Sequence, residues 1–328
     1  MNVPYIARIE LFSDNAQRVK EAFPWKNAMI NRLAALLYAV EDRMADGEAI
    51  RASLELIKEN TGAFSSFRGN SVICIAALLS LSDQQQSQLT NTLAVYEMMK
   101  HAKFRASDYL VIAAYQIAAN CAPDQYLRTV ERAKAFYDGM KAEHRFLTGY
   151  DDYIFAAMLG LSDIDVVSGV KRMEQLYADL KPEFFSSNSV QSLTQVLVLG
   201  EEASASAARV LELREAFRAR NIRMDKEYTL SSLGVLSLLP VGKEEIVNAV
   251  SETCEILRSK KGFGKWSVYD QELLLLSASL AAFKYVGDVQ NGIVSSVLST
   301  SITNIIIAQQ TAITAAAAAS AAASSSSG

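Results

Sequence analysis

Apolar residues recur along most of this chain at the three- and four-residue spacing of α-helices, and almost no stretch alternates strictly between apolar and polar positions. Only 5 Pro and 15 Gly interrupt the 328 residues, and the helical spacing fills the segments between them. The pattern therefore predicts an all-α protein.

The helical pattern repeats with a period near forty residues. The stretch KFRASDYLVIAAYQIAA at 103–119 is echoed by RFLTGYDDYIFAAMLGLS at 145–162. Intervals of 37, 42, 39, 39 and 39 positions separate the large apolar residues that end successive turns, which are Phe67, Phe104, Phe146, Phe185, Met224 and Phe263. Such a period with two helices per unit is typical of stacked helical hairpins. We predict an α-solenoid-like repeat domain over residues 1–288, with about six hairpins from residue 27 onward.

The repeat also predicts core and capping residues. We expect the turn residues to be buried, so that Phe146→Ala would destabilise the fold. A second series, spaced by 41, 40 and 40 positions, is predicted to be core and comprises Tyr96, Tyr137, Tyr177 and Phe217. Two pairs have the spacing of a capping box at a helix start, namely Thr148 with Asp151 and Ser267 with Asp270.

The C-terminal segment, residues 289–328, differs from the rest because no charged residue follows Asp288. Five of its residues fall on one side of a predicted Ala/Ser-rich helix that extends to about residue 319, with disorder beyond; they are Ile302, Ile305, Ile306, Gln309 and Ile313. Polar residues interrupt the apolar run, so we expect no membrane span. Three roles stay open: capping of the last hairpin, self-association with a second copy, or contact with a partner or membrane surface through residues 290–323.

Composition and charge narrow the class of protein. A chain with 50% hydrophobic and 21% charged residues is ordinary for a folded globular protein. The net charge of -4, with Lys and Arg dispersed among Asp and Glu, predicts no nucleic-acid partner. Charges at Arg8 and Glu10 argue against a secretory signal, and three separated cysteines are typical of reduced thiols. We therefore expect a cytoplasmic protein.

No motif predicts catalysis, a metal or a cofactor. GYDDYIF resembles an aspartate-rich magnesium motif but has Phe155 where an acid is required, and the segment from Asp163 to Glu174 resembles a calcium loop but has Ser168 at its glycine position. First-turn acids and an inter-helix turn explain these segments better. The only histidines, His101 and His144, stand at predicted helix ends.

A few polar residues are candidates for binding. Arg68 and Asn70 open the second repeat, Asp152 begins a helix, and Gln191 and Gln195 occupy a helix whose counterparts are apolar. These side chains could line a ligand groove, but the favoured interpretation is a first-turn acid for Asp152 and exposure to solvent for the others.

Four segments together resemble one bacterial family. FPWKNAMINRLAALLYAVEDR, IKENTGAFSSFRGN, MKAEHRFLTGYDDY and the ending AQQTAITAAAAASAAASSSSG are similar, in this order, to the family called domain of unknown function 4003. The resemblance covers nearly the whole chain and implies a cytoplasmic bacterial protein of this length. It implies no activity, cofactor or catalytic residue.

The function favoured by the sequence is a non-enzymatic scaffold for protein–protein interaction, because helical repeats present extended surfaces. The alternative is an enzyme or small-molecule binder whose site lies in a concave groove of the array. Arg68, Asp108, Asp152 and Gln191 would then come together from different repeats.

Overall fold

The computed structural model describes residues 3–69, 72–200 and 206–286. Over these residues the chain forms 14 α-helices and three short 3-10 helices, with no strand. The prediction of an all-α protein is confirmed. Asn70 and the residues of the C-terminal segment, including Ile302, Ile305, Ile306, Gln309 and Ile313, lie outside the described residues, so the predictions about them stay predictions.

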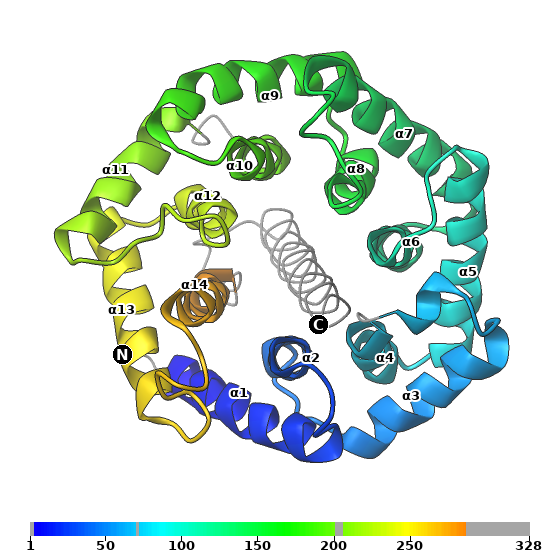
Figure 1. Cartoon of the computed structure of the whole chain (residues 1–328), viewed down its shortest axis with the longest axis horizontal. Coiled ribbons are helices and arrows are strands. Elements are labelled where there is room, and N and C mark those ends of the chain that lie inside the picture. Colours follow the sequence, from blue (N-terminus) through cyan, green and yellow to red (C-terminus); the bar gives the residue numbers. More distant parts are fainter. Residues whose placement is uncertain (1–2, 70–71, 201–205, 287–328) are drawn as a thin grey trace, which may run out of the picture. The chain divides into compact units, whose positions relative to one another are not determined.

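Helices of two kinds alternate along the chain (Figure 1). The odd-numbered helices are α1 (Val3–Ala22), α3 (Gly47–Asn60), α5 (Gln85–His101), α7 (Tyr126–Glu143), α9 (Val166–Leu180), α11 (Ala207–Ala219) and α13 (Lys243–Ser259). The even-numbered helices are α2 (Ala28–Val40), α4 (Val72–Leu81), α6 (Asp108–Asn120), α8 (Asp152–Leu161), α10 (Ser187–Leu199), α12 (Leu230–Leu238) and α14 (Asp270–Val286). The 3-10 helices are η1 (Ser66–Arg68), η2 (Pro123–Gln125) and η3 (Lys181–Glu183).

Apolar content decides which helices are buried. The even-numbered helices are apolar on nearly every side, and every residue of α12 is buried. Odd-numbered helices such as α3 and α9 carry one apolar stripe and turn their charged side to solvent. A helix that is hydrophobic all round is stable only inside a protein, whereas an amphipathic helix belongs at the surface. The sequence therefore fixes which helix of each pair is covered.

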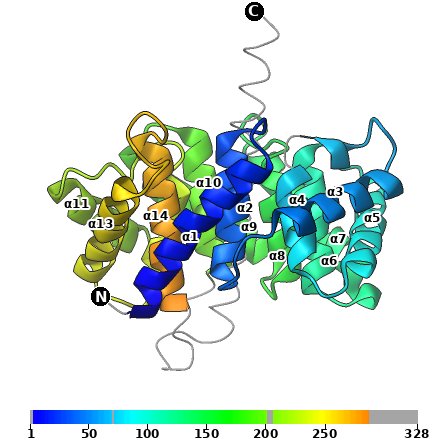
Figure 2. The ribbon, with the colours of Figure 1, turned by 90° about the horizontal axis from the view of Figure 1, so that it is seen from below.

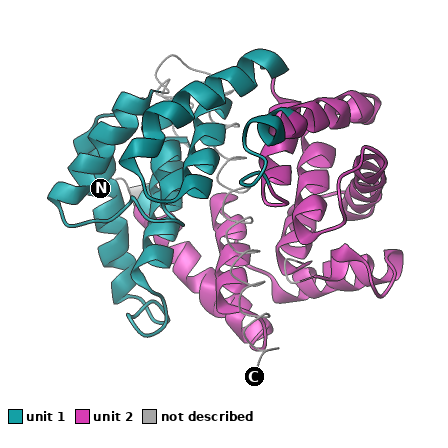
Figure 3. Cartoon of the chain, turned by 45° about the horizontal axis from the view of Figure 1, so that its top comes forward, with its two compact units in different colours: residues 1–5, 139–148, 164–309 teal, residues 6–138, 149–163, 310–328 magenta. Residues whose placement is uncertain are grey.

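The chain forms two compact units (Figure 3). The described part of unit 1 is residues 3–5, 139–148, 164–200 and 206–286, and that of unit 2 is residues 6–69, 72–138 and 149–163. In unit 2, α3 packs on α4 and α5 on α6, while α2 packs on α4 and α6 on α8. In unit 1, α9, α11 and α13 pack on α10, α12 and α14, which pack on one another in order. In Figure 2 the loop that joins α13 to α14 lies at the upper end of this helix pair.

The turn residues are only partly where the repeat predicts them. Four of them are buried as predicted, namely Phe67, Phe104, Met224 and Phe263. The prediction is wrong for Phe146 and Phe185, which are 97% and 102% exposed. Thr148 and Phe184 are buried in the corresponding turns instead. In the turn before α8 the buried residue stands two positions after Phe146. In the turn before α10, Phe184 and Phe185 are adjacent residues of an extended segment and point in opposite directions, so only one of them can enter the core.

The predicted capping boxes are also wrong. The hydroxyl of Thr148 accepts a hydrogen bond from the Gln191 side chain at 3.1 Å. The carboxylate that holds the start of α8 belongs to Asp152, which accepts from the backbone N–H of Gly149 at 2.7 Å. At the start of α14 the Asp270 carboxylate pairs with Arg258 at 2.5 Å. The backbone N–H groups of Thr148 and Ser267, which a capping box would pair with Asp151 and Asp270, donate instead to the carbonyls of His144 at 3.0 Å and Gly264 at 2.9 Å.

The second aromatic series is largely core. Tyr96, Tyr137 and Phe217 are buried, as the repeat predicts. Tyr177 is half-buried, and its ring centroid lies 4.3 Å from that of His144. Within the described part of the chain, no helix is long and apolar enough to cross a membrane.

Candidate functional site

Arg68 and Asp152, both in unit 2, each hold the end of a helix. The Arg68 guanidinium donates to the backbone carbonyls of Lys58 at 2.5 Å and Thr61 at 2.6 Å, which are free carbonyls at the end of α3. The Asp152 side chain is buried at the start of α8. Local helix-end bonding thus accounts for the positions of both side chains.

Gln191 and Gln195 are buried in α10, so the expectation that they face solvent is wrong. Besides the bond of Gln191 to Thr148, the Gln195 amide donates to the sulfur of Met140 at 3.2 Å. Thr148 and Met140 both belong to residues 139–148 of unit 1. The two amides of α10 therefore contact this segment. Sequence spacing gave no signal of these partners, which lie 43 and 55 positions away.

The exposed aromatic side chains gather on one class of loop. Here, odd-to-even loops are those that lead from an odd-numbered helix to the next even-numbered helix. Seven exposed aromatic residues are found among the described residues, and all seven lie on odd-to-even loops; they are Trp25, Phe64, Phe146, Tyr150, Phe185, Trp266 and Tyr269. Five of these are 96% to 105% exposed, namely Trp25, Phe64, Phe146, Phe185 and Trp266. Large exposed aromatics are costly in water and mark contact surfaces when they cluster.

Unit 1 contains a hollow of about 670 Å³ beside two of these loops. It is bounded by the loop between α11 and α12, by α13 and by the start of α14. Its apolar wall comprises Ile222, Cys254, Leu273 and Leu274, and its charged lining comprises Arg223, Lys226, Glu255, Arg258 and Asp270. We call it the α11–α14 hollow.

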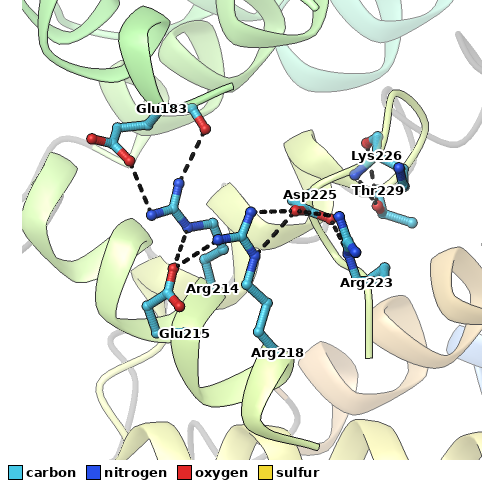
Figure 4. A network of polar contacts seen from close by, with 8 residues as sticks. All are labelled: Glu183, Arg214, Glu215, Arg218, Arg223, Asp225, Lys226 and Thr229. Carbon is cyan, nitrogen blue, oxygen red and sulfur yellow. Dashed lines mark hydrogen bonds and ion pairs between the residues drawn. The ribbon is translucent and has the colours of Figure 1, made fainter. Parts of the chain in front are cut away.

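A network of ion pairs fixes the loop that carries Arg223 and Lys226 (Figure 4). The Asp225 side chain is only 7% exposed and its carboxylate accepts from Arg218 at 2.7 Å and from Arg223 at 3.1 Å. Burial raises the pKa of this carboxyl, but hydrogen bonds and charge from Arg223 and Arg218 outweigh burial and lower it below its ordinary value. Asp225 is therefore ionised near neutral pH and holds both arginines.

Arg214 extends this network to the preceding hairpin (Figure 4). Its guanidinium donates to the carboxylate of Glu183 at 3.0 Å and to that of Glu215 at 2.8 Å. Glu215 also pairs with Arg218 at 3.1 Å. The loop on one side of the hollow is thus tied to η3 and α11 by charge-assisted bonds, which are stronger than neutral ones.

Arg258 holds the opposite wall. Its guanidinium donates to the backbone carbonyls of Phe263 at 2.8 Å and Val268 at 2.6 Å, in addition to its pair with Asp270. Beside it, burial raises the pKa of the Cys254 thiol to about 11. Since a thiol with this pKa is protonated at neutral pH, Cys254 contributes apolar surface and not a nucleophile.

Positive charge concentrates beside the hollow in a way that the sequence analysis missed. Residues 218–226, RARNIRMDK, contain four cations and one acid, and residues 258–265, RSKKGFGK, contain four cations and no acid. The chain as a whole has a net charge of -4. Each segment alone looks like a basic helix end, and only the packing of α11 on α13 brings Arg223 and Lys226 of the first and Arg258 of the second to the same hollow.

A second polar pair lies elsewhere in unit 1. His144 Nε2 and Glu174 Oε2 are 3.0 Å apart, beside a smaller hollow of about 390 Å³ that Glu143 and Glu174 line. Burial, partly offset by His144, and the charge of Glu143 raise the pKa of Glu174. Asp165 caps α9, so the segment from Asp163 to Glu174 is an inter-helix turn and helix start, as favoured from the sequence. Within the described residues, no group of three or more His, Cys, Asp or Glu is placed to hold a metal ion.

These features define, over the described residues, an all-helical protein made of packed helix pairs, with exposed aromatics on its odd-to-even loops and a hollow lined by three cations and two acids. The chain belongs to the family described as "Protein of unknown function (DUF4003)", which matches residues 15–311 and confirms the resemblance seen in the sequence. No curated protein and no solved structure matches the chain.

Proposed function

We propose that this protein is a non-enzymatic helical-repeat scaffold that binds a protein partner through its odd-to-even loops. The observation that carries the proposal is the confinement of all seven exposed aromatics of the described residues to these loops. Trp and Tyr are enriched at the energetic centres of protein interfaces, where their large surfaces leave water. A monomer that keeps such side chains fully in water has no folding reason to retain them.

The proposal includes the α-solenoid-like stacking of hairpins. Two features support it: the period near forty residues and the alternation of covered and surface helices in each unit. Hairpins that repeat present equivalent loops, and five of the seven odd-to-even loops carry at least one exposed aromatic. A role in binding explains why aromatic residues recur in these loops even where they are not buried in the core.

The partner surface we propose is apolar and acidic. The aromatic loops call for apolar contacts, and the exposed Lys265 beside Trp266 calls for negative charge. We keep the cytoplasm of a bacterium as the proposed location and propose no nucleic-acid partner. Self-association or membrane contact through the C-terminal segment also stays a proposal.

The rival site, built from Arg68, Asp108, Asp152 and Gln191, receives less support. Three of these side chains have structural partners: Arg68 and Asp152 at helix ends, and Gln191 at Thr148. Ser107, beside Asp108, caps α6 by accepting from the backbone N–H of Leu110 at 3.2 Å.

Site-specific photocrosslinking in living cells tests the scaffold. A photoreactive phenylalanine analogue is placed at Trp266 in the full chain, and in a matched control at Val167, which is 76% exposed but lies on α9 in the same unit. A discrete crosslinked protein from the Trp266 position alone would support the proposal. Equal labelling at both positions, or none at any odd-to-even loop aromatic, would overturn it.

A further inference from the structure

We propose that the α11–α14 hollow binds a small amphiphilic anion, that is, a phosphomonoester or carboxylate attached to an apolar body. This inference is independent of the protein partner proposed above. The hollow lies wholly within unit 1, and its volume of about 670 Å³ lies in the size range of small-molecule sites.

The acidic group of the ligand is held by Arg223 and Lys226. The Arg223 side chain is 57% exposed, and its bonds to Asp225 use Nε and Nη2 and do not involve Nη1. The Lys226 backbone N–H donates to the Thr229 hydroxyl at 3.2 Å, which fixes the start of the turn, and Lys226 lines the hollow. A guanidinium and an ammonium on one short loop form a recognised arrangement for carboxylate and phosphate oxygens.

The acids of the lining do not cancel these cations. Asp270 is paired with Arg258 at 2.5 Å on the opposite wall. Asp225 is already bound by two arginines beneath the loop. Glu255 lies on α13 and repels an anion from that side, so it directs the acidic group toward Arg223 and Lys226.

The remaining wall calls for an apolar body. Ile222, Leu273 and Leu274 line the hollow together with the protonated thiol of Cys254. A bare phosphate would leave this wall in water, whereas an alkyl or aryl group would cover it at a gain of about 25 cal/mol per Å² of apolar surface. The two halves of the lining therefore select a molecule with one acidic end and one apolar end.

Titration calorimetry on the full chain tests the ligand class with four probes. Octyl phosphate and octanoate supply the acid on an apolar chain, inorganic phosphate supplies the acid alone, and octyl glucoside supplies the chain alone. We expect saturable binding of octyl phosphate or octanoate, at least about tenfold tighter than either partial probe. Which of the two binds more tightly identifies the acid group. Failure of both to bind, or equal affinity for octyl glucoside, would overturn the proposal.

Two matched pairs of variants locate the site. Lys226→Gln should weaken binding by about tenfold, while Lys265→Gln, which removes the same charge from an exposed position outside the lining, should not. Ser251→Trp should block the hollow, while Ser259→Trp, on the same helix outside the lining, should not. Equal losses in both lysine variants, or binding that survives Ser251→Trp, would contradict a site in this hollow. Because Trp266 crosslinking requires no small ligand, failure of this proposal and failure of the scaffold proposal remain distinguishable.

Discussion

Phe146 and Phe263 occupy equivalent turns of unit 1 but opposite environments: the Phe146 side chain is 97% exposed and that of Phe263 is 1% exposed. A truncation removes stabilising contacts only where the side chain is buried. We expect Phe146→Ala to change the free energy of unfolding by less than about 0.5 kcal/mol. The control, Phe263→Ala, should cost about 3–5 kcal/mol. Urea denaturation of both variants measures this, and a large loss in the Phe146 variant would mean that its ring is packed.

Asp225 makes the stability of unit 1 depend on pH. Its folded pKa lies below its ordinary value of 3.8, so its contribution is fully present above that value and is lost as the pH falls through the lower folded pKa. Asp225→Asn should therefore lower the melting temperature at neutral pH and make it fall less steeply below about pH 4. Melting curves between neutral pH and about pH 2 follow this.

The control for Asp225 is an exposed aspartate that makes no such network. Asp83→Asn, in the turn before α5, should leave the neutral melting temperature and the acid slope as they are in the parent. Parallel acid slopes for the parent and Asp225→Asn would show that the carboxylate does not hold Arg218 and Arg223.

At the residue scale, the sequence predicts what local spacing determines. Tyr96 and Phe217 are core because they fall on the covered side of a helix, which periodicity shows. Gln191 and Gln195 could not be placed, because their burial depends on Thr148 and Met140, partners in a distant turn. A buried amide is tolerated only where a partner is available, and the partner is a property of the fold.

At the scale of the element, α8 approaches α7 closely in unit 2 because Gly160 has no side chain. A Cβ at this position would lie 2.7 Å from the Thr129 carbonyl oxygen and 2.9 Å from the Ala133 nitrogen, both backbone atoms. Arg132 of α7 reinforces the approach by donating to the Gly160 carbonyl at 3.1 Å. Backbone cannot move aside as a flexible side chain can.

Gly160→Ala should therefore destabilise the protein, although alanine favours helix. We expect a loss of about 1–3 kcal/mol from overpacking. Gly62→Ala is the control, because a Cβ there meets nothing within 4 Å. Thermal unfolding of the two variants checks this, and a Gly160→Ala protein as stable as the parent would show that α8 does not sit on the α7 backbone.

The sequence predicts best which helices are covered and which are at the surface, and it predicts least well where each helix begins and how it is capped. The apolar runs of α4 and α12 and the amphipathic stripe of α9 are visible in the sequence and set which helices are covered. The predicted capping box at Thr148 failed because the Thr148 backbone N–H donates to the His144 carbonyl at 3.0 Å and the helix starts later, with Asp151 as its N-cap. A cap is worth about 1 kcal/mol, so a competing backbone bond displaces it easily.

At the scale of the whole molecule, exposure of aromatic residues follows loop class and not sequence period. The repeat correctly brings a large apolar residue to each turn, but which residue of the turn is buried varies from turn to turn. The turns 102–107 and 181–186 are equally long, yet the first buries Phe104, whereas the second buries Phe184 and leaves Phe185 in water. The α11–α14 hollow was equally invisible, since its cations come from two segments about forty residues apart.

The exposed aromatic residues of the odd-to-even loops should not be needed for folding, but they should contribute much of the apolar surface that the protein exposes to solvent. We expect replacement of Phe146, Phe185 and Trp266 by serine to keep the melting temperature within about 2 °C of the parent, because side chains outside the core add little to stability. The triple variant should elute markedly earlier from a hydrophobic-interaction column. The matched control replaces Leu127 and Val167, which are exposed aliphatic residues at the starts of α7 and α9.

The control variant should elute close to the parent, since its two aliphatic side chains carry less apolar surface than three aromatic ones and lie on helices apart from the odd-to-even loops. Unchanged retention of the triple variant would mean that the aromatic side chains are covered in solution, either by the chain itself or by a second copy. Light scattering separates these cases, because a second copy doubles the mass per particle and dilution restores the monomer. A large fall in melting temperature would instead show that the aromatic loops are part of the folded core, which would remove the observation on which the scaffold proposal rests.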